Sequence, residues 1–280
     1  MIRAGFNVFT LLTTLLFMSQ CNEEMVVAVE FPDDKFLMAL IDQNVDKNGD
    51  GIISHYEAQV ITSLDVSDYG ITDLRGIEAF VNLDTLLCGF NSLSRLDVPA
   101  ITGLVYLSCS RNQIKTLDVS GLVSLRRLYC EGNELSALDV STNSALELLF
   151  CQENELQEID VQNNSALKML YCQHNLLSSL DCSNNSALQV LRCHNNLLEN
   201  LNVSNCGSLF QLFCHNNPNR PTNNQLVNLD ISSNTALISI QLTSLPTLQQ
   251  VCVWQTPFPP DGVSVNTSLS PNVYFATDCN

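Results

Sequence analysis

The sequence predicts a solenoid of short parallel β-strands, in which each coil of the chain repeats the one before it. Two observations lead to this fold class. Residues of the same kind recur at a constant interval of 21 over more than half of the chain. Within each interval, buried-type residues alternate with polar or aromatic ones, and a period of two is typical of a strand with one buried face. A unit this short cannot bury its apolar face alone, so such units are stable only when they stack.

Three columns of residues define the repeat unit. A cysteine marks each unit, namely Cys88, Cys109, Cys130, Cys151, Cys172, Cys193 and Cys214. An asparagine follows three residues later, namely Asn91, Asn112, Asn133, Asn154, Asn175, Asn196 and Asn217. A leucine precedes each cysteine by two residues, and a Leu-Asp-Val triplet comes later in the unit. Leucine and cysteine should fill the interior, whereas the asparagine should hydrogen-bond backbone groups where the chain leaves the strand.

The unit L-x-x-L-x-C-x-x-N-x-L-x-x-L-D-V-S-x-N-x-x is a leucine-rich repeat with cysteine in place of one leucine. It resembles the 21-residue, cysteine-containing repeats of internalin-like proteins and of Bacteroidetes surface proteins. The resemblance implies a leucine-rich-repeat solenoid of the α/β class, mainly β, with a parallel strand ladder on its concave face. The short unit leaves little room for an α-helix on the other wall, where we expect β or 3₁₀ segments.

The chain divides into five predicted segments. Residues 1–20 are typical of a signal peptide, because Arg3 precedes an apolar run that is too short to span a bilayer. A linker or tether (21–30), an N-terminal cap (31–82), the repeats (83–244) and a proline-rich C-terminal cap (245–280) follow. An insertion from Pro218 to Gln225 follows the asparagine of the seventh unit and should loop out without interrupting the strands.

The residues after the apolar run carry a second resemblance. Ser19-Gln20-Cys21 is similar to the cleavage box of bacterial lipoproteins, in which the cysteine is lipidated, although Gln20 departs from the small residue usual there. The following acidic residues, Glu23 and Glu24, look like the export tag of Bacteroidetes surface lipoproteins. The resemblance implies a secreted protein or an outer-membrane surface lipoprotein, which contacts the membrane only through a lipid on Cys21.

Residues 46–57, DKNGDGIISHYE, match the 12-residue EF-hand calcium loop at every informative position. Calcium takes six to eight oxygen ligands. Here the side chains and the Ile52 carbonyl would supply them, from Asp46, Asn48, Asp50, Ile52, Ser54 and Glu57. Residues 35–45 should form the entering helix, so the cap is predicted to be a helical EF-hand. Because there is one such loop, we expect Ca²⁺ to be structural, not a switch.

The twelve cysteines fall into several groups. The seven that recur every 21 residues should be free, buried thiols, because parallel side chains on neighbouring coils do not suit disulfide geometry. Cys182 replaces the valine of a Leu-Asp-Val triplet and should join the same core, whereas Cys206 sits in a turn with no obvious partner. Cys252 and Cys279, in the C-terminal cap, are predicted to form a disulfide.

The strand alternation points a stripe of residues at solvent on the concave face. The candidate ligand-binding residues are Tyr106, Arg127, Tyr129, Leu148, Phe150, Met169, Tyr171, Arg192 and Phe213. Exposed aromatic side chains suit protein hot spots or stacking on sugar rings, or they pack on one another and only stabilise the sheet. Beside them, His194 and His215 share a repeat position, which is compatible with a transition-metal pair or with solvated polar residues.

Charge and motifs exclude several function classes. The chain has 29 acidic and 12 basic residues, a net charge of −17, and would repel nucleic acid. It carries none of the common hydrolase, metalloprotease or phosphate-loop motifs. We therefore expect a non-catalytic, adhesin-like binding protein, secreted or at the cell surface, with a protein partner. A glycan-binding accessory lipoprotein and a structural envelope protein are the alternatives.

Overall fold

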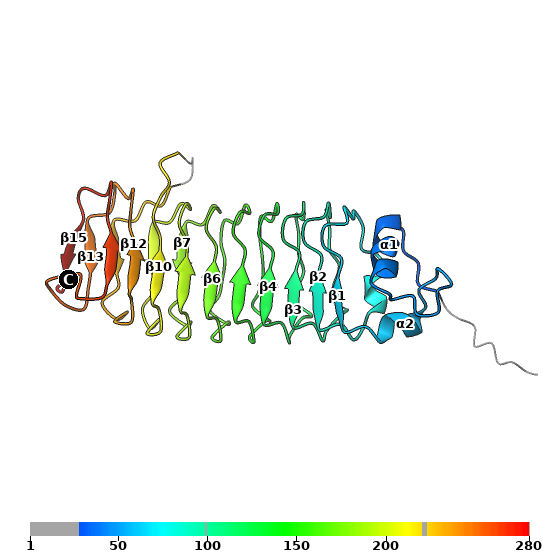
Figure 1. Cartoon of the computed structure of the whole chain (residues 1–280). Coiled ribbons are helices and arrows are strands. Elements are labelled where there is room, and N and C mark those ends of the chain that lie inside the picture. Colours follow the sequence, from blue (N-terminus) through cyan, green and yellow to red (C-terminus); the bar gives the residue numbers. More distant parts are fainter. Residues whose placement is uncertain (1–27, 99, 220–222, 280) are drawn as a thin grey trace, which may run out of the picture.

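The computed structural model describes residues 28–98, 100–219 and 223–279. The chain winds into an elongated solenoid, in which short strands lie side by side in a row and helices cover the N-terminal end (Figure 1). The predicted signal peptide and Cys21 lie outside the described residues. Over the described ranges, no helix combines the length and the apolar character that a membrane span requires.

One parallel sheet of ten strands runs along the solenoid, which confirms the predicted mainly-β strand ladder. Neighbouring strands pair in register, so that Leu86, Leu107 and Leu128 stack in one buried column. The insertion after β10 does not interrupt the sheet, because β10 pairs with β8 on one side and β12 on the other. In sheet order the strands are β1 (Ser63–Asp65), β2 (Thr85–Leu87), β3 (Tyr106–Ser108), β4 (Arg127–Tyr129), β5 (Leu148–Phe150), β6 (Met169–Tyr171), β8 (Val190–Arg192), β10 (Gln211–Phe213), β12 (Ser239–Gln241) and β14 (Ser264–Asn266).

The returning half of the coils has little regular structure. Two strands pair there in the middle of the chain, β7 (Ser179–Asp181) and β9 (Asn200–Asn202). Three more form a small sheet near the C-terminus, namely β11 (Asn228–Asp230), β13 (Gln250–Cys252) and β15 (Tyr274–Ala276). Apart from a bridge between Leu96 and Leu117, the other returning segments are turns and bends. The expected β segments thus form on only some coils, and the described repeats contain no 3₁₀ helix.

The column cysteines lie inside the solenoid. All seven are fully buried and none is disulfide-bonded. Burial raises the pKa of Cys109 and of Cys151 to about 12, because the interior disfavours a thiolate. These side chains therefore pack as small apolar groups.

The asparagine three residues after the cysteine ties each coil to the coil before it. Asn133 Nδ2 donates to the carbonyls of Cys130 (3.0 Å) and Cys109 (3.0 Å), and its Oδ1 accepts the N–H of Ile114 (3.0 Å). The buried N–H depends on this side chain alone, whereas each of the two carbonyls also accepts from a neighbouring asparagine of the column. Equivalent bonds recur at Asn112, Asn154, Asn175 and Asn196.

The seventh unit differs from the prediction. Asn224, not Asn217, holds the ladder position there, with bonds to Cys193, Cys214 and Leu198. Asn217 is exposed. The inserted residues therefore precede the ladder asparagine. Asn224 takes the ladder position because its side chain reaches the unpaired backbone groups of the preceding coil.

A second asparagine ladder lies on the returning half of the coils, at the second asparagine of the repeat unit, to which the sequence pattern had assigned no role. Asn143, Asn164, Asn185 and Asn234 are fully buried. Asn164 Nδ2 donates to the carbonyls of Val140 (3.0 Å) and Asn143 (2.8 Å), but the Oδ1 atoms of all four residues have no hydrogen-bond partner. Other coils place an apolar side chain or a thiol at this position, namely Ile101, Leu122 and Cys206.

Cys206 has no disulfide partner, as predicted, but it belongs to the core, which the sequence did not indicate. Its side chain is fully buried, and its Sγ donates to the carbonyl of Cys182 at 3.1 Å. The thiol takes the place of an asparagine amide donor, and its backbone N–H bonds the residue three before it, as in the other coils of that column. A position that looks like a turn in the sequence is therefore an interior position.

The N-terminal cap has two short helices, α1 (Asp34–Asp42) and α2 (His55–Gln59), and a 3₁₀ turn, η1 (Ile77–Ala79). Asp33 caps α1, because its Oδ1 accepts the N–H groups of Lys35 and Phe36. Its Oδ2 accepts the N–H and the hydroxyl of Thr72 (2.7 and 2.8 Å), which fixes the helix on the first coils. The helix buries Phe36, Ala39 and Leu40 against the end of the core.

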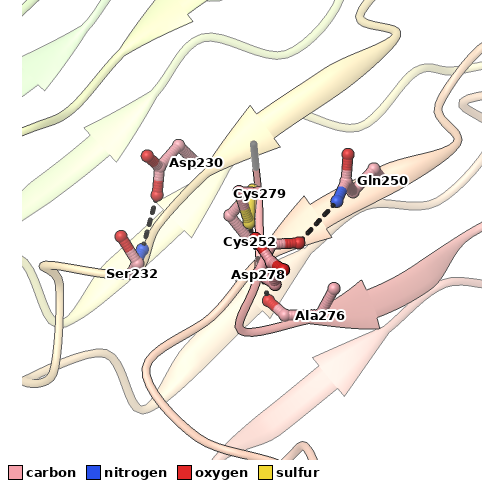
Figure 2. The surroundings of a disulfide bond; sticks show 7 residues. All are labelled: Asp230, Ser232, Gln250, Cys252, Ala276, Asp278 and Cys279. Atoms are coloured by element: carbon pink, nitrogen blue, oxygen red, sulfur yellow. Dashed lines mark hydrogen bonds between the residues drawn. A yellow bond between two sulfur atoms is a disulfide. The ribbon is translucent and has the colours of Figure 1, made fainter.

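The C-terminal cap closes the other end. Figure 2 shows the disulfide between Cys252, in β13, and Cys279, whose Cα atoms are 5.9 Å apart. Beside it, Gln250 Nε2 donates to the carbonyl of Asp278 at 3.2 Å. These links hold the last residues against the β11–β13–β15 sheet, over the final coils.

Candidate functional site

The nine predicted ligand-binding residues lie on the outer face of the ten-stranded sheet, and we call them the stripe. The strand register sets them in two adjacent columns. Tyr129, Phe150, Tyr171, Arg192 and Phe213 pair in succession to form the longer column. The other column holds Tyr106, Arg127, Leu148 and Met169. None of the nine is buried, Arg127 is exposed, and the remaining eight are partly exposed.

The aromatic rings of the stripe stack on one another. The rings of Tyr129 and Phe150 lie 4.5 Å apart at an angle of 5°, and those of Phe150 and Tyr171 lie 4.3 Å apart at 2°. Tyr106 meets the edge of Tyr129 at 5.1 Å. Both faces of Phe150 are therefore covered by its neighbours, so the ring edges and the tyrosine hydroxyls are left for a ligand.

Arg192 extends this stack toward the C-terminus. Its guanidinium carbon lies 4.5 Å from the ring centroid of Tyr171 and 5.2 Å from that of Phe213. Such cation–π contacts orient the planar guanidinium between the two rings. Arg127, in the neighbouring column, lies 5.9 Å from the Tyr106 ring.

A third column runs beside the stripe, one residue after each cysteine. It consists of Glu131, Gln152, Gln173, His194 and His215. Each of these side chains has a buried nitrogen or oxygen without a hydrogen-bond partner. Of this column, only His194 and His215 stood out in the sequence, because they share a repeat position. The constant offset from the cysteines was the signal that could have identified Gln152 and Gln173 as members.

The histidines of this region form a stack. His194 and His215 are nearly parallel, with centroids 4.4 Å apart, and His174 meets His194 edge-on at 5.2 Å. Burial, with smaller effects from His215, His174 and Arg192, lowers the pKa of His194 to about 3. In-plane nitrogen lone pairs of two parallel rings do not converge on one ion. In the described ranges, no group of three or more His, Cys, Asp or Glu side chains is arranged to hold a metal. The geometry thus disfavours a transition-metal pair.

The residue just before each ladder asparagine shapes this border of the sheet. Six successive coils place it in the left-handed backbone region, with φ between 53° and 66°. Glycine and asparagine adopt this conformation readily, whereas other residues pay a steric cost. Only two of the six are of those types, so composition did not reveal the turn. The six are Phe90, Arg111, Gly132, Glu153, His174 and Asn195.

The predicted calcium-loop residues lie between α1 and α2 in the N-terminal cap. Asp46 accepts the N–H groups of Gly49 (2.7 Å) and Gly51 (2.9 Å) on its two oxygens, and both glycines have positive φ. Asn48 Oδ1 accepts the N–H of Asp50 at 2.9 Å, and Asp50 Oδ1 accepts that of Ile52 at 2.8 Å. The side chains therefore turn inward on the loop and fold it around their own oxygens.

Glu57 closes the loop from helix α2. Its Oε1 accepts the N–H of Lys47 (2.8 Å), and its Oε2 accepts the N–H (2.9 Å) and the hydroxyl (2.8 Å) of Ser54. Burial raises the pKa of Glu57, but these hydrogen bonds together outweigh burial, and the net pKa is lowered. The carboxylate is consequently ionised and fixed at the end of the loop.

Known proteins share the fold. No protein-family model matches the chain, and no curated protein matches it. Among solved structures, the functional domain of InlJ from Listeria monocytogenes, which includes a cysteine ladder, is 27% identical with a TM-score of 0.66, over 89% of this chain and 62% of that one. The chain thus spans under two thirds of that domain's length.

Two further structures agree in fold. An internalin C2 from Listeria monocytogenes is 19% identical with a TM-score of 0.61, over 88% of this chain and 94% of that chain. A leucine-rich-repeat protein of Leptospira interrogans is 17% identical with a TM-score of 0.59, over 79% and 67% of the two chains. The chain therefore has an internalin-like leucine-rich-repeat fold, with a parallel β-solenoid and a cysteine ladder.

Proposed function

We propose that the chain is a non-catalytic binding protein, secreted or at the cell surface, that recognises a protein partner through the stripe. The observation that carries this proposal is the stack of Tyr129, Phe150 and Tyr171 on an open sheet. These rings are held rigidly by their neighbours and are still partly exposed. Rigid aromatic side chains lose little entropy on binding, and they are common among the hot spots of protein interfaces.

The stacking geometry favours a protein over a glycan. A sugar binds an aromatic residue by lying on the face of its ring, but both faces of Phe150 are occupied at 4.3 and 4.5 Å. Ring edges and hydroxyl groups instead suit the mixed apolar and polar contacts of a protein surface. The Phe150 ring is therefore not available as a stacking platform for a sugar.

The test compares capture by stripe variants. The immobilised chain is exposed to a protein extract from its surroundings and, in parallel, to a glycan array. Phe150→Ser should weaken capture of a protein at least tenfold, which corresponds to about 1.4 kcal/mol of binding free energy. The matched control is Val123→Ser, which changes an exposed apolar residue outside the stripe (59% exposed) and should leave capture unchanged.

A second stripe variant separates binding from stability. Tyr129→Phe combined with Tyr171→Phe keeps the ring stack but removes both hydroxyls, so the melting temperature should stay the same while capture weakens. Capture that survives Phe150→Ser would place the site elsewhere. Concentration-dependent sedimentation of the chain alone, lost in Phe150→Ser, would instead support the structural envelope role.

We also propose that the 46–57 loop binds a structural Ca²⁺ and that Cys21 carries a lipid, as the sequence patterns imply. The donor types fit calcium, because three carboxylates and further neutral oxygens are the hard ligands that Ca²⁺ requires. The three carboxylates are not gathered around one point in the described structure, so they would have to turn toward the ion. The residues that would hold the ion are Asp46, Asn48, Asp50, Ile52, Ser54 and Glu57. Bound there, the ion would offset the charge of the carboxylates and rigidify the helical cap.

The calcium proposal predicts a stability change on chelation. At a free Ca²⁺ concentration of ten times the dissociation constant, the ion should stabilise the fold by about 1.4 kcal/mol, so a chelator should lower the melting temperature. Asp46→Ala should abolish this response, whereas Asp42→Ala, at the end of α1 outside the loop, should keep it. An identical melting curve with and without chelator would contradict the proposal.

A further inference from the structure

Arg192 is a charged side chain that the fold holds in place but does not pair. It lies in β8 between the rings of Tyr171 and Phe213. Its Nε is buried without a hydrogen-bond partner, and within the described part of the chain its guanidinium has no carboxylate in salt-bridge range. Six other basic side chains do have such a carboxylate, namely Arg75, Arg95, Arg111, Lys115, Arg126 and Lys168. Among the described residues, Lys35, Lys47 and Arg127 also have no such carboxylate, but Arg192 is the one that two aromatic rings hold in place.

The surroundings of Arg192 contain no acidic residue on three consecutive coils. The segments 168–174, 189–195 and 210–216 carry one lysine, one arginine and three histidines, but no aspartate or glutamate, although the chain has 29 acidic residues. These segments are adjacent, because β6, β8 and β10 pair in register. The nearest acidic residues on the next coil, Glu147 and Glu153, already pair with basic side chains. A locally positive patch therefore interrupts a negative surface.

Two histidines complete this patch on the polar side of Arg192. His194 and His215 present stacked rings next to it, and in each the buried, unpartnered nitrogen is Nδ1. The lowered pKa values of both rings, caused chiefly by burial, keep them neutral at pH 7. In the tautomer whose proton is on Nε2, a neutral histidine donates a hydrogen bond from that atom. In that tautomer, the patch combines one guanidinium fork with two neutral imidazole donors.

We propose that Arg192, with His194 and His215, recognises a carboxylate side chain of the partner protein. A guanidinium binds a carboxylate through two parallel N–H···O bonds, and rings on both of its faces leave those N–H groups free in the guanidinium plane. The assignment rests on the proposed function. It predicts that the partner presents an acidic residue flanked by apolar residues. The acidic residue would contact Arg192, and the apolar residues would contact the aromatic part of the stripe.

The net charge of the chain favours a single carboxylate over a polyanion as the group that Arg192 binds. The chain as a whole carries −17, so nucleic acid or an anionic membrane is repelled over distances of about a Debye length, roughly 8 Å at physiological salt. One carboxylate on an otherwise apolar or basic segment meets only the local patch. A protein segment of this kind is the occupant that both the patch and the remaining surface allow.

The experiment uses pairs of immobilised peptides that are identical except for one central residue. Each carries Glu, Gln or Lys between flanking Phe and Leu residues, and binding of the full chain is measured at physiological salt. Glu peptides should bind at least tenfold more tightly than their Gln and Lys counterparts. Arg192→Gln should remove this preference, and Arg192→Lys should remove most of it, because lysine keeps the charge without the planar fork. Arg95→Gln, which changes an exposed arginine outside the stripe, should retain the preference.

Other outcomes separate this inference from the proposed function. Equal binding of Glu and Gln peptides, or a Glu preference that survives in folded Arg192→Gln, would overturn the carboxylate assignment. If Phe150→Ser then still abolished capture of a protein, the proposed function would stand without it. Binding of an anionic glycan that depends on Arg192 would also overturn the assignment. Arg192→Lys remains informative if the glutamine variant fails to fold, because it preserves the cation between the two rings.

Discussion

Phe150, the last residue of β5, and Cys151, which follows it, are neighbours in the chain but belong to different kinds of column. Cys151 points inward, where the same residue recurs on seven coils and every copy is buried. Phe150 points outward, where the equivalent residue is Leu87, Ser108, Tyr129, Tyr171, Arg192 or Phe213 on other coils. The inward column is constant because each coil must match the coil before it. The outward column varies along the axis, and this variation gives the stripe its aromatic centre and its basic end.

The two asparagine ladders show that inward-facing columns differ in how strictly they require one residue type. In the first ladder each amide satisfies three backbone groups, and seven coils keep asparagine. In the second ladder the amide oxygen has no partner, and three coils replace asparagine with Ile101, Leu122 or Cys206. Constancy in the sequence therefore reflects the buried N–H that only the amide oxygen of the first ladder pairs.

The largest expected effect comes from breaking the first ladder. Asn154→Leu leaves the buried N–H of Leu135 without a partner, whereas the carbonyls of Cys130 and Cys151 each keep one of their two asparagine donors. At about 1–3 kcal/mol for the unsatisfied N–H and about 0.5–1.5 kcal/mol for each of the two other lost hydrogen bonds, the unfolding free energy should fall by roughly 2–6 kcal/mol. Urea denaturation followed by circular dichroism measures the loss. A fall of less than about 1 kcal/mol would show that the ladder is dispensable.

The matched substitution in the second ladder should cost much less. Asn164→Leu also removes two hydrogen bonds, to Val140 and Asn143, but it removes a buried unpaired oxygen as well. Leu122 already occupies the same position two coils earlier. We expect a loss of at most about 2 kcal/mol by the same denaturation assay. Equal losses for the two variants would erase the distinction between the ladders.

The smallest effect concerns the polar column beside the stripe. Burial, together with His215, His174 and Arg192, lowers the pKa of His194 to about 3, below its ordinary value near 6.5. The unfolded chain therefore binds a proton that the folded chain does not, and stability that is complete above pH 6.5 declines as the pH falls toward 3. Because the ring is partly exposed, we expect a loss of about 1 kcal/mol between pH 7.5 and 5. His194→Gln should flatten this dependence, and an unchanged slope would contradict the assignment.

Spacing alone predicted much of this molecule, namely the strand ladder, the buried cysteine column and the outward stripe. A period of 21 fixes which side chains share a column, but it does not state how they contact. The face-to-face stacking of Phe150 between Tyr129 and Tyr171 depends on side-chain orientation, which the sequence pattern does not contain. The sequence pattern also did not show that Asn224, and not Asn217, holds the ladder position. This depends on where the insertion bends the chain, and two asparagines in the same loop fit the pattern equally well.

The measurement that tests the register most directly is thiol labelling of the folded protein. Nine cysteines in the described residues are free and buried, and burial raises the pKa of these thiols, so that few are thiolates at pH 8. In a Cys21→Ser background, a small thiol reagent should modify none of the nine at an appreciable rate in buffer and all nine in guanidinium chloride. Rapid labelling of the cysteine column in the native protein would mean that these side chains face solvent, and the stripe would then face inward.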